Sequence, residues 1–131
     1  MTQQPVELIL LRQWASYMAM PIWIADSDEN VLYYNEPAEV ILGRRFDEAG
    51  ELKLEEVPEV LKLTAEDGSP LAAADFPPLI ALRNRRPAHR LVRGVGLDGV
   101  SRTVEVTAFP IEGQGERHLG AVAVFWEVSD D

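Results

Sequence analysis

The pattern of apolar and polar positions predicts two strands and a short helix near the start of the chain. Apolar runs at residues 22–25 and 31–34 lie on either side of a polar segment at 26–30. The runs are rich in β-branched and aromatic residues, which favour strands, and the polar segment has the composition of a turn. A helical pattern then runs from residue 36 to Gly43. This stretch therefore predicts a strand, a turn, a second strand and a helix.

Both ends of this helix carry residues that suit helix termini. Asn35 can act as the N-cap, because its side-chain oxygen can accept a hydrogen bond from a free backbone N–H. Pro37 falls in the first turn, where its missing N–H costs little, and Gly43 suits a left-handed C-cap. Between these ends we expect a buried apolar stripe made of Ala38, Val40, Ile41 and Leu42.

An earlier segment, residues 6–19, also has helical periodicity. Its apolar stripe follows i+4 spacing and is widened by two flanking residues; it consists of Val6, Leu10, Trp14 and Met18, with Ile9 and Leu11 beside them. The simpler interpretation is a helix that packs on its own domain. The stripe is wider than one contact needs, so the alternative is that a second subunit covers part of it.

The middle of the chain, residues 44–74, is the least regular part. A short helix is plausible near 57–63, and residues 66–70 have the composition of a turn. Asp75 is a good N-cap for the next helix, which has to end before Pro87.

The last third of the chain predicts three strands, at residues 89–97, 100–111 and 119–128. Asp98 and Gly99 form a hairpin signal between the first two. Polar and apolar residues alternate along the middle strand, as in an antiparallel strand with one wet face. The apolar face of that strand is expected to meet the helices, and it consists of Val104, Val106 and Ala108.

In the last strand both faces are apolar. We expect Ala121, Ala123 and Phe125 to share the inner face. The outer face then carries Val122, Val124 and Trp126, and the N-terminal helix is the obvious cover for it. If a second subunit takes part, the expected dimer interface consists of Val6, Ile9, Leu10, Trp14, Val124 and Trp126.

Runs of strands and runs of helices that are segregated in this way indicate an α+β fold with an antiparallel sheet. At 131 residues the chain is one domain by size. We expect residues 1–19 to form a capping or dimerisation helix, and residues 20–131 to form the domain itself.

Composition excludes several kinds of chemistry. The chain has no cysteine, which rules out disulfides, thiolate catalysis and cysteine-bound zinc. Its net charge of −10 argues against nucleic-acid binding, which needs a positive surface. No apolar run approaches the roughly 20 residues of a membrane span, and Glu7 and Arg12 interrupt the N-terminal apolar segment. We therefore expect a cytoplasmic protein with no membrane partner.

Over about residues 17–129 the sequence resembles a PAS domain of the bacterial signalling type. The matching segments are, in chain order, Asp26 at the end of the first strand, Asn35-Glu36-Pro37-Ala38 with Gly43, Asp67-Gly68-Ser69-Pro70-Leu71, Phe76 to Arg83, Leu97-Asp98-Gly99, Phe109-Pro110-Ile111 and Val124 to Ser129.

The resemblance implies a five-stranded antiparallel sheet with short helices against its concave face. It also implies a module that senses a small ligand or cofactor, dimerises, and passes a signal from its last strand to an effector. The family usually closes that strand with an Asp-x-Thr pattern, where this chain has Glu127-Val128-Ser129 and stops two residues later. We expect a stand-alone domain or an excised one, with no effector in this chain.

The residues limit which cofactors a PAS domain of this sequence could use. Flavin photochemistry through a cysteine adduct is excluded, because the chain has no thiol. Haem would need an axial ligand, commonly histidine, on a cavity helix. The helix predicted at 76–85 has none, and His89 and His118 fall at predicted strand starts. We therefore do not expect haem, and the sequence leaves any other cofactor open.

A cavity between sheet and helices would be lined by inward-facing residues. The candidates are Trp23, Ala25, Leu79, Val104, Val106, Ala108, Ala123 and Phe125. The same residues also describe an ordinary solid core. Three of them are alanines, which favours some free volume.

A basic cluster stands out in this acidic chain: Arg83, Arg85, Arg86, Arg90 and Arg93. The simpler interpretation is ion pairing with the acidic segment 47–59, or plain solvation. The alternative is that Arg90 or Arg93 turns into the cavity and holds an acidic ligand, since arginine suits carboxylates. Which of the two points inward depends on the strand register, which the sequence leaves open.

No catalytic or metal-binding motif is complete. Asp26-x-Asp28-x-Asn30 resembles the opening of a calcium loop, but Val31 and Pro37 stand where that loop needs Gly and Glu, so we interpret it as a turn. No Ser-His-Asp set, close carboxylate pair or glycine-rich phosphate loop is found at useful spacing, so we do not expect an enzyme.

Two functions are consistent with these features. The first is a PAS sensor domain that binds a small apolar or weakly acidic molecule in its core and acts as a dimer. The alternative is a PAS-type interaction module with a solid, ligand-free core that only dimerises or docks on a partner.

Overall fold

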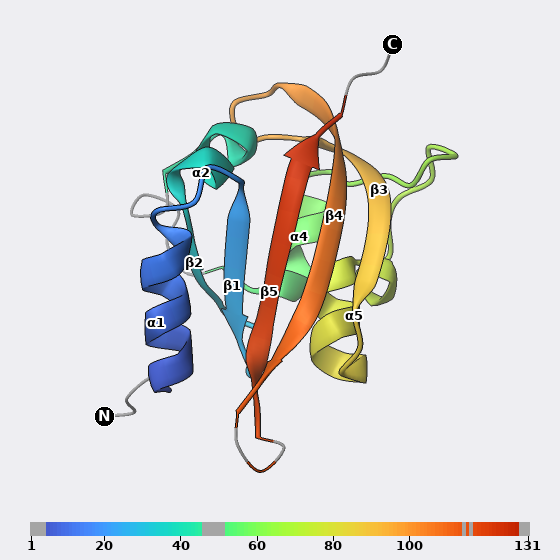
Figure 1. Ribbon diagram of the computed structural model, residues 1–131. Coiled ribbons are helices and arrows are strands. Elements are labelled where there is room, and N and C mark those ends of the chain that lie inside the picture. The colour runs from blue at the N-terminus through green and yellow to red at the C-terminus, as the bar shows by residue number, and fades with distance from the viewer. Residues whose placement is uncertain (1–4, 46–51, 114, 116, 129–131) are drawn as a thin grey trace.

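The computed structural model describes residues 5–45, 52–113, 115 and 117–128. Its centre is a five-stranded sheet in the order β2-β1-β5-β4-β3, in which every neighbouring pair is antiparallel (Figure 1). The strands are β1 (Ile22–Asp26), β2 (Val31–Tyr34), β3 (Ala88–Val95), β4 (Ser101–Glu112) and β5 (His118–Glu127). The predicted α+β class with an antiparallel sheet is confirmed.

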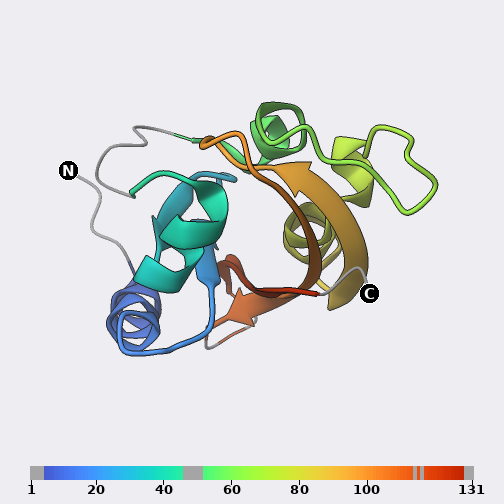
Figure 2. The same cartoon turned by 90° about the horizontal axis from the view of Figure 1, so that it is seen from above.

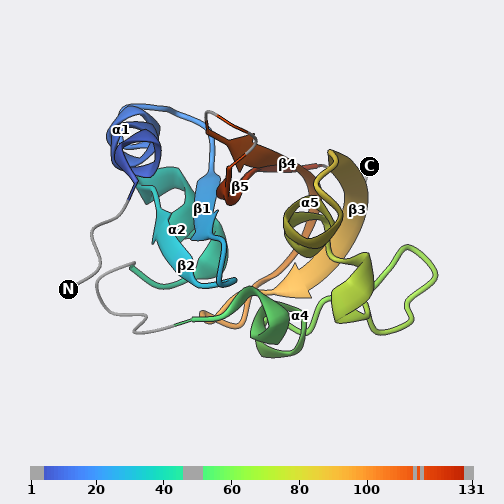
Figure 3. The same cartoon turned by 90° about the horizontal axis from the view of Figure 1, so that it is seen from below.

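The helices lie on both sides of the sheet. They are α1 (Val6–Ala15), α2 (Glu36–Leu42), α4 (Val57–Val60) and α5 (Pro77–Asn84), with 3₁₀ turns η1 (Leu54–Glu56) and η2 (Ala73–Asp75). The sheet is strongly curved, and α5 lies inside the curve of β3 whereas α1 lies on the other side of β1 (Figures 2 and 3). No helix within the described ranges is long and apolar enough to cross a membrane.

Two hydrophobic clusters fill the two sides. The larger one lies on the concave face, where Trp23, Val106 and Phe125 meet residues of α2, α4 and α5. The smaller one packs α1 against the convex face and consists of Leu8, Ala15, Ile22, Ile24, Leu119 and Val122. The expected inner and outer faces of β5 are therefore confirmed, and α1 covers the outer one.

The helix α1 differs from its prediction in length and in orientation. It ends at Ala15 rather than at residue 19. The Ala15 carbonyl, which a longer helix would bond to the N–H of residue 19, instead accepts from the N–H of Met18 and from Asn35 Nδ2. The buried residues are Leu8 and Ala15, with Leu11 and Met18 partly buried beside them. Of the line predicted to pack, Val6, Leu10 and Trp14 are exposed and only Met18 meets the domain.

The predicted ends of α2 are confirmed. The Asn35 side chain accepts a hydrogen bond from the backbone N–H of Ala38, and Gly43 closes the helix in the left-handed region with φ of 78°. A Cβ at position 43 would collide with the backbone of Asp98, so glycine is required there for packing as well. The expected stripe is wrong at one position, because Val40 faces solvent and is 65% exposed.

Asn35 also joins three elements. Its Oδ1 accepts hydrogen bonds from the backbone N–H of Ile22 at 3.0 Å and of Ala38 at 3.2 Å. Its Nδ2 donates to the carbonyl oxygens of Ala15 at 3.0 Å and Met20 at 2.8 Å. The side chain is 1% exposed. One buried amide therefore fixes the end of α1, the start of β1 and the start of α2 relative to one another.

The start of α5 corrects the sequence prediction. Asp75 does not cap this helix: it is exposed in η2, Phe76 occupies the N-cap position, and no side chain caps the helix. The reason is that Pro77 and Pro78 fill the first two helical positions and have no N–H to be capped. The next N–H, from Leu79, already bonds to the carbonyl of Phe76 at 2.9 Å.

An ion-pair cluster ties α5 to the opposite edge of the sheet. Arg83 donates from Nε to Glu29 at 2.7 Å and from Nη2 to Glu55 at 3.0 Å. The hydrogen bond from Arg83 lowers the pKa of Glu29 below its usual 4.5. For Arg83, the simpler interpretation of the basic cluster, ion pairing with the acidic segment 47–59, therefore holds through Glu55. Three acidic residues of that interpretation, Asp47, Glu48 and Glu51, lie outside the described residues.

We predict that Asn35→Ala lowers the free energy of unfolding by about 3 kcal/mol, because it leaves the buried N–H groups of Ile22 and Ala38 without the acceptor and removes two hydrogen bonds to carbonyls. Denaturant unfolding followed by circular dichroism measures the change. Val40→Ala, on the exposed face of the same helix, is the control and should change stability by less than about 0.5 kcal/mol. Equal effects of the two substitutions would contradict the role assigned to Asn35.

We predict that Glu29→Gln destabilises the fold at pH 7 and that this difference disappears in acid. A lowered folded-state pKa stabilises the protein above the unfolded value of 4.5, and the contribution is lost as the pH falls through the folded pKa. Unfolding curves of both proteins between pH 7 and about pH 3 test this. In an Arg83→Met background the same substitution should show a smaller pH dependence, since the hydrogen bond that contributes most to the lowered pKa is gone while the charge of Lys53 remains.

Candidate functional site

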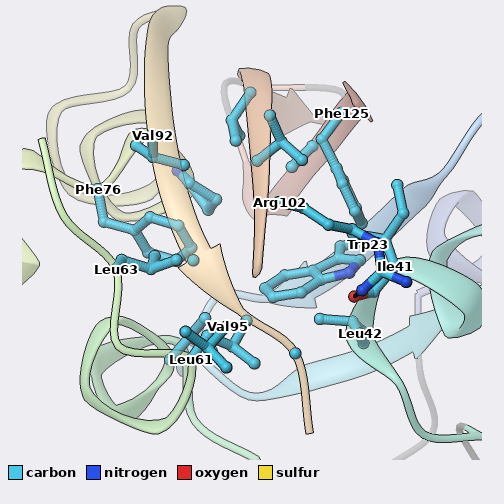
Figure 4. A pocket seen from close by; sticks show the side chains of 17 residues that line it. Trp23, Ile41, Leu42, Leu61, Leu63, Phe76, Val92, Val95, Arg102 and Phe125 are labelled. Atoms are coloured by element: carbon cyan, nitrogen blue, oxygen red, sulfur yellow. Dashed lines mark hydrogen bonds between the residues drawn. The ribbon is translucent and has the colours of Figure 1, made fainter. Parts of the chain in front are cut away.

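A small cavity of about 60 Å³ lies between the concave face of the sheet and the helices. Figure 4 shows that Val92, Phe76 and Leu63 form one end, and that Trp23, Ile41, Leu42 and Arg102 gather at the other. The lining residues are Trp23, Ile41, Leu42, Val57, Leu61, Leu63, Phe76, Pro78, Val92, Gly94, Val95, Gly96, Arg102, Val104, Val106, Ala123 and Phe125.

Local sequence explains why space remains here. Trp23 on β1 pairs in register with Ala123 on β5, so a large side chain lies beside a small one. Gly94 on β3 and Gly96 just after it add no side chain to the lining. The cavity thus lies where residues with small or no side chains, Ala123, Gly94 and Gly96, adjoin the aromatic residues of the lining.

Trp23 is the centre of an aromatic cluster. Its ring meets Phe125 edge-on at 5.5 Å between centroids and Phe76 at 6.4 Å, and it lies 6.3 Å from the ring of Tyr34. Edge-to-face pairs at these distances stabilise a core beyond their area burial. The side chain is 5% exposed, and its indole Nε1 has no hydrogen-bond acceptor among the described residues.

Arg102 closes the end of the cavity next to α2. Its Nη1 donates to the carbonyl of Ile41 at 3.0 Å. Its Nη2 lies 3.6 Å from Oδ2 of Asp98, and its Nε lies 3.5 Å from Oε1 of Glu127. The side chain is only 16% exposed. One guanidinium therefore connects the cavity, α2, the β3–β4 hairpin and the last residue of β5.

Asp98 is held in this arrangement by the hairpin itself. Its carboxylate accepts a hydrogen bond from the backbone N–H of Val100 at 3.1 Å. That bond lowers the pKa of Asp98, and the nearby charge of Arg102 adds to the effect. Beside it, the N–H of Leu97 donates to the carbonyl of Leu42 at 2.7 Å, so the hairpin also caps the end of α2.

The structure separates the predicted cavity residues into two groups. Trp23, Val104, Val106, Ala123 and Phe125 line the cavity. The remaining apolar candidates are buried in the same concave-face cluster without lining it, and they are Ala25, Leu79 and Ala108.

The two predicted arginines do not line the cavity. Arg90 pairs with Val106 and so shares the concave side of the sheet, where it is half-buried. Arg93 pairs with Thr103 on the convex side and is exposed. The cavity arginine is Arg102, which was not predicted. The sequence contained a signal for it, because alternation along β4 places Arg102 on the same face of the strand as Val104 and Val106.

The lining offers little for metal or acid–base chemistry. Apart from Arg102 and the Trp23 indole it consists of apolar residues and glycine, with no histidine. The described residues contain no group of three or more potential metal ligands. The loop at Asp26 is a turn in which its Oδ1 accepts from the N–H groups of Asp28 and Asn30. Haem and flavin do not fit about 60 Å³, since sites for molecules of that size occupy about 300–1,000 Å³.

A second surface of interest is the outward face of α1. Val6 is 62% exposed, Leu10 59% and Trp14 50%, and Ile9 is exposed as well. The other two residues of the expected dimer interface, Val124 and Trp126, are half-buried on the convex face of β5. The six residues lie on the convex side of the molecule.

No protein-family model and no curated protein matches the sequence. Solved structures do match its fold. The PAS domain of a protein from Colwellia psychrerythraea has a TM-score of 0.66 and 14% identity, over 95% of this chain and 99% of that one.

Two further matches are PAS domains from another bacterium and from the fruit fly. The PAS domain of nitrogen regulation protein NR(II) from Vibrio parahaemolyticus has a TM-score of 0.60 and 18% identity, over 91% of this chain and 98% of that one. The PAS domain of the fruit-fly ELK potassium channel has a TM-score of 0.73 and 10% identity, over 92% and 96%. The fold implied by the sequence resemblance is therefore confirmed: this chain has the fold of a PAS domain.

Proposed function

We propose that this chain is a sensor domain that binds a small molecule in the cavity on its concave face and relays its occupancy through β5. The observation that carries the proposal is Arg102, because this side chain lines the cavity and also reaches Glu127, the last residue of β5. A ligand that moves Arg102 would change the contact with the end of that strand.

The rest of the cavity supports binding rather than catalysis. Its wall is apolar and closely packed, so it can bury a small molecule. The described lining residues contain no carboxylate or imidazole that could act as a general acid or base. Among similar folds, one belongs to a protein named for nitrogen regulation.

We predict that Ala123→Val fills the cavity and leaves the free energy of unfolding unchanged or raises it, because Ala123 lines free space. The matched control is Ala108→Val, which lies in the same buried cluster away from the cavity and should cost about 1–3 kcal/mol by overpacking. Denaturant unfolding separates the two. Similar losses for both variants would show that no usable space exists at residue 123.

The binding itself is tested on the purified full chain. Native mass spectrometry should detect a co-purified small molecule, or a screen of small apolar compounds should raise the melting temperature, and Ala123→Val should abolish either effect. If no compound is retained, none raises the melting temperature and the variant behaves as the parent protein does, the sensor proposal fails and the interaction module with a ligand-free core replaces it.

A second candidate function, compatible with the first, is dimerisation through α1. It is favoured by the exposed apolar line of Val6, Ile9, Leu10 and Trp14, since monomeric proteins seldom leave such a contiguous apolar patch uncovered. The occupant we propose is a second copy of this chain, which would place the same patch on both sides of a two-fold interface.

We predict that the chain is a dimer at micromolar concentration and that Leu10→Lys makes it a folded monomer, because the substitution places a charge in the apolar patch. Sedimentation velocity measures the assembly, and circular dichroism confirms folding. Val60→Lys adds the same charge at an exposed apolar residue of α4, outside the patch, and should leave the dimer intact. A parent protein that sediments as a monomer at this concentration would refute the dimer.

A further inference from the structure

The Trp23 indole N–H is the one polar group of the described cavity lining that is left without a partner. Its nitrogen is shielded from solvent and meets no acceptor among the described residues. Leaving a buried donor unpaired costs about 1–3 kcal/mol, and native structures contain few such groups. In Figure 4 the nitrogen edge of the ring faces the end of the cavity where Ile41 and Arg102 lie. The cavity therefore presents a single directed hydrogen-bond donor.

A buried water molecule typically makes two to four hydrogen bonds. Near the nitrogen of Trp23 the described lining offers such partners only at the Ile41 carbonyl and Arg102, which already bond to each other, and the rest of the surroundings is apolar. The only other side-chain donors in the described lining belong to Arg102, which donates to the Ile41 carbonyl and forms ion pairs with Asp98 and Glu127. A mostly apolar molecule with one acceptor can accept a hydrogen bond from the indole N–H and pack its apolar part against the lining.

The charges around Arg102, at the end of the cavity next to α2, argue against an anionic ligand. Arg102 already faces two carboxylates, those of Asp98 and Glu127, and donates to the carbonyl of Ile41. A ligand carboxylate would have to displace these groups and give up its own hydration in an apolar cavity. The arginine therefore favours an uncharged ligand over an acidic one.

We propose that the cavity selects small, uncharged, largely apolar molecules with one hydrogen-bond acceptor, such as a carbonyl oxygen, which takes the proton of Trp23 Nε1–H. This inference rests on the proposed ligand-binding function and names the class of ligand. A cavity of about 60 Å³ is smaller than one that holds benzene, about 150 Å³, so the ligand has only a few non-hydrogen atoms.

Three smaller probes of equal size and shape separate the possibilities: acetone, its hydrocarbon analogue 2-methylpropene, and its anionic analogue acetate. Each is titrated into ¹⁵N-labelled full-length protein, and the three indole N–H signals are followed by NMR. The signal lost in Trp23→Phe identifies Trp23. We expect acetone to move this signal downfield with saturation, 2-methylpropene to bind without a downfield shift, and acetate to bind at least about tenfold more weakly than acetone.

The variant Trp23→Phe isolates the hydrogen bond from the change in packing. It should weaken the binding of acetone about tenfold more than the binding of 2-methylpropene, because only acetone loses a hydrogen bond while both probes meet the same altered wall. Equal effects on the two probes, or acetone binding with an unmoved Trp23 signal, would overturn the proposed hydrogen bond to the ligand. Acetate binding as tightly as acetone would overturn the preference for an uncharged ligand. These outcomes leave ligand binding intact, whereas failure of every probe, together with no co-purified molecule, would count against the proposed function itself.

Discussion

The fold depends on one buried amide. Asn35 satisfies two backbone N–H groups and two carbonyls that belong to three different elements. Without it the N–H of Ile22 at the start of β1 and the N–H of Ala38 in α2 would be buried in an apolar environment without an acceptor, which is costly. Because β1 contributes Trp23 and pairs directly with β5, the same amide also sets where the aromatic cluster meets the concave face. The position of the cavity is therefore a consequence of how the chain enters its first strand.

At the opposite end of the cavity the decisive group is charged. Arg102 is held by a carbonyl of α2 and by carboxylates from the hairpin and from β5, so segments far apart in sequence converge on one side chain. Arg102 is therefore well placed to couple the cavity to the end of β5. Only its few contacts have to change for α2, the hairpin and β5 to shift relative to one another. The hydrogen bond from Leu97 to Leu42 keeps the hairpin and α2 together beside it.

Local chemistry allowed much of this to be predicted. Asn35 and Gly43 are readable as helix ends, and alternation along β4 places Val104, Val106 and Ala108 on the inner face. Where two local signals compete, tertiary structure decides. Both sides of α1 are apolar, so periodicity could not tell that Leu8 and Ala15 would meet Ile22 and Ile24 while Leu10 faced outward. Arg102 shares the parity of Val104, but its partners Ile41 and Glu127 are set by the register of distant strands, which no local pattern contains.

The strand order places β1 and β5 side by side in the middle of the sheet, so residue 22 pairs with residue 124. During synthesis on the ribosome, β1 and β2 emerge long before their central neighbour exists. Until then Trp23 and Ile24 lack the neighbouring strand β5, and the loop that must close runs from residue 22 to residue 124, which slows folding. A partly synthesised chain therefore exposes an apolar strand, and its tendency to aggregate falls only when β5 is inserted.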